Sequence, residues 1–227
     1  MIRARLTHAR LTPAAAFAVT LAVMLAACGG SMTLNEHVLD AETLRHTRCI
    51  AVLPFANATR LDPAGMMVAN AVADVLLRSG RVNPLAPDEI VQLLAITNTA
   101  ATPATTAMIA QAYGQSLGVE AVLMGTVTEM GTPRIGSTIK EPVVGFVATI
   151  VSTKSGDVVW TATASNYHHS VWLETIESRD ALLRAVAQDA THALLADRPT
   201  LSGPLGPCAT LQEKLVKGEL RPGTAAH

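Results

Sequence analysis

The feature that most constrains this chain is an uncharged, apolar stretch, residues 11–27, that ends immediately before Cys28. Three arginines precede it: Arg3, Arg5 and Arg10. A basic region, an apolar run and small residues at a cleavage site form, in this order, a secretory signal peptide. The run is short for a membrane span, and no charged stop-transfer cluster follows it. We therefore expect residues 1–27 to be removed and the other 200 residues to fold outside the cytoplasm.

Cys28 directly follows Leu-Ala-Ala and is followed by Gly29. This arrangement resembles the lipobox of bacterial lipoproteins, which implies that Cys28 carries a diacylglycerol and fatty acyl chains such as palmitate. A glycine rather than an aspartate after the cysteine implies the outer membrane, on its periplasmic face. Several acyl chains make a stable anchor, because each buried methylene contributes about 0.8 kcal/mol. The alternative is an ordinary signal peptide followed by an unmodified cysteine.

The composition of residues 28–227, the part expected to be exported, limits the kinds of partner that the protein can bind. Without the three signal-peptide arginines, 14 basic and 18 acidic side chains remain, a formal charge of −4. No basic stripe is present, which argues against nucleic acid as a partner. Only 3% of the residues are aromatic, so platforms for stacking sugars or bases are scarce. The length suits one domain with a sizeable core.

Two cysteines remain after Cys28, namely Cys49 and Cys208. In an exported protein an even pair favours a disulfide. The alternative is two buried, unpaired thiols, and spacing alone does not decide between them.

The chain divides into four parts. We expect a signal peptide over residues 1–27 and a lipidated tether over 28–47, with one short helix near its end. A single α/β domain follows over 48–198, and a C-terminal tail over 199–227. Within the domain, the expected strands are 49–55, 81–85, 119–129, 143–153 and 158–165, and the expected helices are 63–79, 87–96, 103–117 and 179–196. The order β-α-β-α-α-β-β-β-α predicts a mixed β-sheet flanked by helices.

Sequence patterns for catalysis or metal binding are weak. Residues 114–118 match G-x-S-x-G, but a hydrolase elbow needs a strand before the serine and a helix after it, whereas here a helix ends and a strand begins. His168 and His169 are adjacent, so their side chains diverge, and no nearby cysteine or carboxylate pair completes a metal site. We expect no catalytic residue, no metal and no cofactor, and therefore no enzyme.

Three motifs in a fixed order carry a family resemblance: residues 50–57 (IAVLPFAN), 118–127 (GVEAVLMGTV) and 155–160 (SGDVVW). Together they resemble an outer-membrane lipoprotein superfamily. It includes the curli secretion-pore lipoprotein, the Pel exopolysaccharide-export lipoprotein and the lipoprotein activator of a peptidoglycan synthase. The segment 140–145, with the strand of Trp160 and the lone Trp172, is most similar to the Pel lipoprotein. The resemblance implies a mixed sheet flanked by helices and, in several members, rings on the inner leaflet of the outer membrane.

The pore-forming relative sends long amphipathic hairpins into the membrane at two links, which correspond here to residues 131–142 and 166–177. A spanning hairpin needs about 20 residues of alternating apolar character, and neither link supplies them. The resemblance therefore implies a periplasmic, homo-oligomeric accessory of an export pore or envelope assembly machinery, with exopolysaccharide export preferred. The alternative is a monomeric regulator that docks on a peptidoglycan synthase.

Trp172 lies in the second of these links, in a short apolar tip flanked by polar residues. Such a tip can dip into a membrane interface, where an indole places its ring in lipid and its N–H in water. The equally weighted alternative is that Trp172 folds back onto the sheet.

Overall fold

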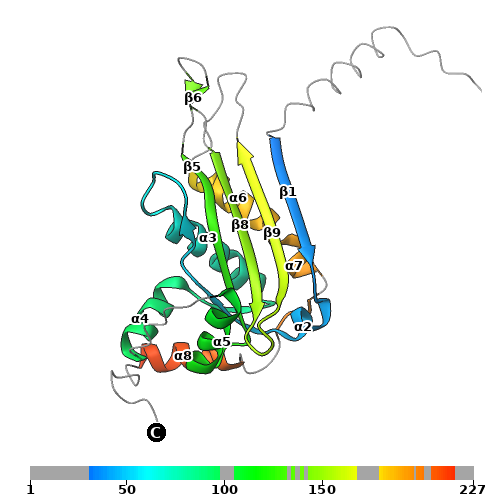
Figure 1. The fold of residues 1–227 in the computed structure, drawn as a ribbon, viewed down its shortest axis with the longest axis vertical. Coiled ribbons are helices and arrows are strands. Elements are labelled where there is room, and N and C mark those ends of the chain that lie inside the picture. Colours follow the sequence, from blue (N-terminus) through cyan, green and yellow to red (C-terminus); the bar gives the residue numbers. More distant parts are fainter. Residues whose placement is uncertain are drawn as a thin grey trace, which may run out of the picture.

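One seven-stranded mixed sheet organises the chain in the computed structural model (Figure 1). The structure describes residues 31–97, 105–131, 134–135, 139–140, 143–167, 179–196, 198–201 and 206–217. The strands of the sheet are β1 (Ser31–Val38), β2 (Cys49–Val52), β3 (Ala56–Asn57), β4 (Asn83–Leu85), β5 (Ala121–Gly131), β8 (Val143–Ser152) and β9 (Val158–Tyr167). Their order is β1-β9-β8-β5-β2-β4, with β3 paired to β5. Strand β2 is parallel to β4 and β5, while β5, β8, β9 and β1 pair antiparallel.

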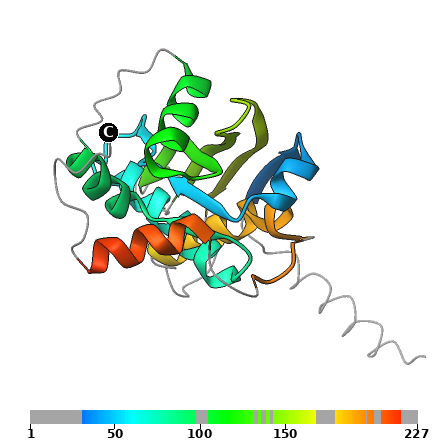
Figure 2. The same ribbon diagram turned by 90° about the horizontal axis from the view of Figure 1, so that it is seen from below.

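Helices cover both faces of this sheet (Figure 2). They are α2 (Ala41–His46), α3 (Ala64–Ser79), α4 (Pro87–Thr97), α5 (Thr106–Leu117), α6 (Arg179–Ala190), α7 (His192–Ala196) and α8 (Gly206–Val216). Helices α3 and α6 pack on one face and form the larger apolar core with it. Helices α4, α5 and α8 contribute to a second core on the other face. The predicted α/β fold, a mixed sheet flanked by helices, is confirmed.

Burial of both faces of β2 explains why its sequence is a continuous apolar run. Side chains alternate along a strand, so Ile50 and Val52 enter the core under α3 and α6. Cys49 and Ala51 enter the opposite core. All four residues are fully buried, which is the environment of a strand covered on both faces.

Two glycines end their helices as expected. Gly80 follows α3 and Gly118 follows α5, with φ of 61° and 68°, so each supplies the left-handed conformation of a helix C-cap. The start of α5 differs slightly from the expectation: Thr105 caps it, accepting a hydrogen bond from the backbone N–H of Met108.

The expected tether is wrong over residues 31–38, whereas the short helix expected near its end is present as α2. Residues 31–38 form β1, which pairs with β9 along its whole length as an edge strand of the sheet. Asp40 then caps α2 by accepting hydrogen bonds from the backbone N–H groups of Glu42 and Thr43. The domain therefore begins at least 17 residues before the expected position 48.

The expected tail is also wrong in part. Residues 206–216 form α8, which packs against β2 and β4 and buries Cys208. The link 131–142, expected as a plain loop, contains a two-residue ladder in which β6 (Arg134–Ile135) pairs with β7 (Ile139–Lys140). The expected helix 179–196 divides into α6 and α7 at Thr191, whose hydroxyl donates to the carbonyl of Ala187 and competes with the helical backbone bonds.

Candidate functional site

One end of the sheet brings together the strand ends next to Cys28 and Trp172, the two residues for which the sequence predicts membrane contact. Ser31 pairs with Tyr167, Tyr167 pairs with Val143, and Val143 pairs with Gly131, so these four residues form one row across β1, β9, β8 and β5. In Figure 1 these strand ends lie together at the top of the sheet, and β6 lies beyond them. The chain enters the sheet at Ser31, and the links 131–142 and 166–177, which correspond in position to the hairpins of the pore-forming relative, adjoin this row.

The two residues assigned to this end, Cys28 and Trp172, lie outside the described residues, as do His168 and His169. The sequence positions of the first two relative to the row are nevertheless clear. Cys28 precedes Ser31 by three residues, and Trp172 follows Tyr167 by five. None of the helices in the described part of the chain combines the length and the apolar composition that a membrane span requires.

Strand β1 is fixed to the domain by a buried polar contact that sequence analysis missed. The indole Nε1 of Trp160, which is fully buried, donates to Oε1 of Glu36 at 2.7 Å. The backbone N–H of Leu194, in α7, donates to the same oxygen at 2.9 Å. One carboxylate thus joins β1, β9 and α7, and it holds β1, the strand that begins three positions after Cys28, against the core.

A polar face lies beside this strand, which we call the threonine-rich face. It consists of alternate residues on three neighbouring strands: Thr33, Asn35 and His37 of β1, Thr161, Thr163 and Ser165 of β9, and Val147 and Thr149 of β8. These side chains are exposed or half-buried, in contrast to the fully buried Trp160, Ala162 and Ala164 on the other face of β9.

The edge next to the threonine-rich face carries exposed apolar side chains. Leu34 and Val38 of β1 are 42% and 41% exposed, and Leu39, which follows the strand, is 60% exposed. The outer edge of β1 has no strand neighbour within the described sheet. Unpaired edges and exposed apolar rows of this kind are features of surfaces that contact other proteins.

The two remaining cysteines are joined in the structure. Cys49 in β2 and Cys208 in α8 form a disulfide, with Cα atoms 5.5 Å apart and a sequence separation of 159. Both residues are fully buried in the second core. The bond links the start of the first central strand to the last described helix.

The structure gives no catalytic meaning to the G-x-S-x-G match. Ser116 lies inside α5, where its hydroxyl donates to the carbonyl of Ala112, and Gly118 is the helix cap. The turn geometry of a nucleophile elbow is therefore not formed at Ser116. Among the described residues, no group of three or more His, Cys, Asp and Glu side chains could hold a metal ion.

Solved structures of other proteins have a similar fold. The PelC dodecamer from Paraburkholderia phytofirmans matches with a TM-score of 0.53 and 20% identity, covering 74% of this chain and 100% of that one. The chain shares the fold of PelC. A second PelC dodecamer structure, of a variant, matches with a TM-score of 0.50 and 21% identity over 74% of this chain and 99% of that one.

Lipoprotein GNA1162 from Neisseria meningitidis follows with a TM-score of 0.48 and 20% identity, covering 65% of this chain and 97% of that one. No family model and no curated protein matches the chain. The resemblance to the lipoprotein superfamily, drawn from three sequence motifs, is thus confirmed at the level of the fold.

Proposed function

We propose that this protein is a non-enzymatic lipoprotein, anchored to the periplasmic face of the outer membrane through Cys28, that forms a ring serving exopolysaccharide export. The observation that carries the proposal is the position of Ser31. It begins β1 in the same row of the sheet from which the links 131–142 and 166–177 depart.

The short distance from the lipid to the sheet supports this orientation. Ser31 lies three positions after Cys28 in sequence, and an extended chain spans at most about 3.6 Å per residue. An acylated Cys28 would therefore hold this end of the sheet within about 11 Å of the membrane surface. A regulator that reaches a distant synthase needs a longer connection than this, so the arrangement favours a membrane-proximal assembly.

Two surfaces support self-assembly. The threonine-rich face and the adjacent edge of β1 remain uncovered in one subunit, and Leu34, Val38 and Leu39 are exposed along that edge. Two of the solved structures that share the fold are PelC dodecamers. A closed ring would cover such surfaces by packing each subunit against the next, and it would surround a central passage.

The mass of the membrane-extracted protein tests the proposal. Full-length protein, extracted in mild detergent from isolated outer membranes, should elute as one closed oligomer of high mass. Cys28→Ser should remove the protein from the membrane fraction. A monomer after gentle extraction would overturn the ring and favour the regulator of a peptidoglycan synthase. A Cys28→Ser protein that still sediments with membranes would overturn the anchor.

A further inference from the structure

A cavity of about 310 Å³ lies where three distant segments of the chain meet. Residues 45–48 at the end of α2, Arg81 after α3, and residues 198–201 line it. Five of its lining side chains are basic: Arg45, His46, Arg48, Arg81 and Arg198. Within the described part of the chain, no acidic side chain lines it. This concentration of positive charge contrasts with the negative net charge of the exported protein.

The cavity is held together by backbone hydrogen bonds between its segments. The N–H of Leu201 donates to the carbonyl of Gly80 at 2.8 Å, and the N–H of Asn83 donates to the carbonyl of Arg48 at 2.7 Å. Its walls are therefore fixed by the fold before any ligand arrives, which lowers the entropic cost of binding.

Arg198 forms the buried part of the wall. Arg198 is 6% exposed. Its guanidinium donates hydrogen bonds to the carbonyl of Thr47, at 3.1 Å, and to the carbonyl of Leu44 near the end of α2. Its Nε has no hydrogen-bond partner among the described residues. Burial lowers the pKa of Arg198 to about 10, while the nearby Glu120 opposes that shift, so the group stays cationic at neutral pH.

The other arginines are only partly neutralised. Arg81 donates to the carbonyls of Leu195 and Ala196 at the end of α7, and such carbonyls carry only partial negative charge. Arg45 lies 3.7 Å from Glu42 in an exposed pair, which is worth little in water. Contacts to helix ends explain why Arg81 and Arg198 are placed here, but they leave the cavity with an excess of positive charge.

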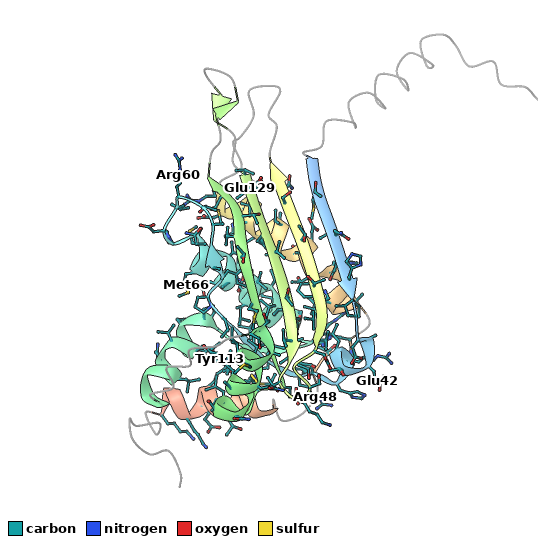
Figure 3. The ribbon with its side chains drawn as sticks, in the orientation of Figure 1. Glu42, Arg48, Arg60, Met66, Tyr113 and Glu129 are labelled. Carbon is teal, nitrogen blue, oxygen red and sulfur yellow. A yellow bond between two sulfur atoms is a disulfide. The ribbon has the colours of Figure 1, made fainter. Side chains whose placement is uncertain are left out.

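We propose that this cavity binds a compact, multiply charged oxyanion that carries phosphate groups or several carboxylate groups. Guanidinium groups bind both through paired N–H···O bonds, and several of them converge here from separate segments. The cavity lies beyond the Val38 end of β1, and Figure 3 shows Arg48 at that end of the molecule. Strand β1 spans about 25 Å, so a ligand enters from the side away from Ser31.

Calorimetric titration of the full-length mature lipoprotein in non-ionic detergent tests this site. Pyrophosphate and citrate are the probes, with sodium chloride at matched ionic strength as the blank. We expect saturable binding of at least one probe, and Arg45→Gln/Arg48→Gln should raise its Kd at least tenfold. Both side chains are exposed, so the variant should keep the melting temperature of the wild type.

Arg60→Gln/Arg184→Gln is the matched control, because it removes the same charge from two exposed positions outside the cavity lining. Arg60 lies at the other end of the molecule in Figure 3. This variant should bind like the wild type. Absence of saturation with both probes, or an equal loss in the two double variants, would overturn the proposal. If Arg45→Gln/Arg48→Gln does not fold, Arg48→Gln alone is compared with the control. We then expect a smaller loss of affinity for the probe.

A lipid source of the oxyanion is distinguished by vesicles. Vesicles containing phosphatidylglycerol should not compete with the soluble probe, because the cavity faces away from the anchored end. If the vesicles compete with the soluble probe in the wild type but not in Arg45→Gln/Arg48→Gln, the oxyanion belongs to lipid headgroups. That result would overturn the proposal that the ligand enters from the side away from Ser31.

Discussion

At the scale of single residues, Glu36 shows how one carboxylate ties an edge strand to the core. It accepts hydrogen bonds from the buried indole of Trp160 and from the backbone N–H of Leu194. Glu36→Ala would leave both donors without this acceptor. Because unsatisfied buried donors cost about 1–3 kcal/mol each, we expect a loss of about 2–4 kcal/mol in the free energy of unfolding. Urea denaturation followed by tryptophan fluorescence measures it.

Two further variants show whether the acceptor atom is responsible. Glu36→Gln keeps an oxygen at the same place, so its loss should be about 1 kcal/mol. His37→Ala changes the neighbouring residue, which is exposed on the threonine-rich face, and should stay within about 0.5 kcal/mol of the wild type. Equal losses for Glu36→Ala and His37→Ala would show that the hydrogen bonds contribute little.

The same residue explains why β1 was missed in the sequence. Met32, Leu34 and Val38 alternate with polar residues, as strand residues do, but Glu36 occupies the third position of this otherwise apolar row. A charged residue at this position is typical of a solvent-exposed segment, not of a strand that packs on a core. Its partners lie 124 and 158 residues away in sequence, so no local pattern predicts them.

At the scale of elements, the segments with strong internal patterns were predicted and those fixed by distant contacts were not. The apolar run of β2 and the helical spacing of α3 carry their own signal, and Gly80 and Gly118 mark the helix ends. For α8 the sequence indicates only an amphipathic turn or two around residues 211–215 and favours a disulfide at Cys208. The position of the helix on the sheet depends on packing against β2 and β4 and on that disulfide. The basic cavity was missed for the same reason, since its arginines come from three separate segments.

The disulfide is the element-scale feature that awaits a direct test. Thiol labelling of the unfolded, unreduced mature protein should find no free cysteine, whereas two reactive thiols would rule out the bond. A bond between residues 159 apart restricts the unfolded chain strongly, and chain-entropy models give about 4–5 kcal/mol, with measured values often lower. Cys49→Ser/Cys208→Ser should therefore melt at a clearly lower temperature than the wild type. The unreduced wild type is its control.

At the scale of the whole molecule, the proposed function requires an orientation. In that orientation the row at Ser31 would face the membrane, and the basic cavity at the other end of β1 would face the periplasm. Cys28 and the two links that leave the row would then act together, the lipid as the anchor and the links as contacts with the headgroups. Trp172 is the residue in those links best suited to report the contact, because an indole prefers the interface between lipid and water.

The chain has only two tryptophans, and the other one, Trp160, is fully buried in the core. Lipid-dependent changes in tryptophan fluorescence therefore report on Trp172. With the mature lipoprotein in liposomes, brominated lipids should quench part of the emission of the wild type but none of that of Trp172→Phe. Quenching that persists in Trp172→Phe, or its absence in the wild type, would contradict the contact. If Trp172 instead packs on the sheet, Trp172→Ala removes a buried ring and should cost about 3–5 kcal/mol, whereas an interfacial ring leaves the melting temperature nearly unchanged.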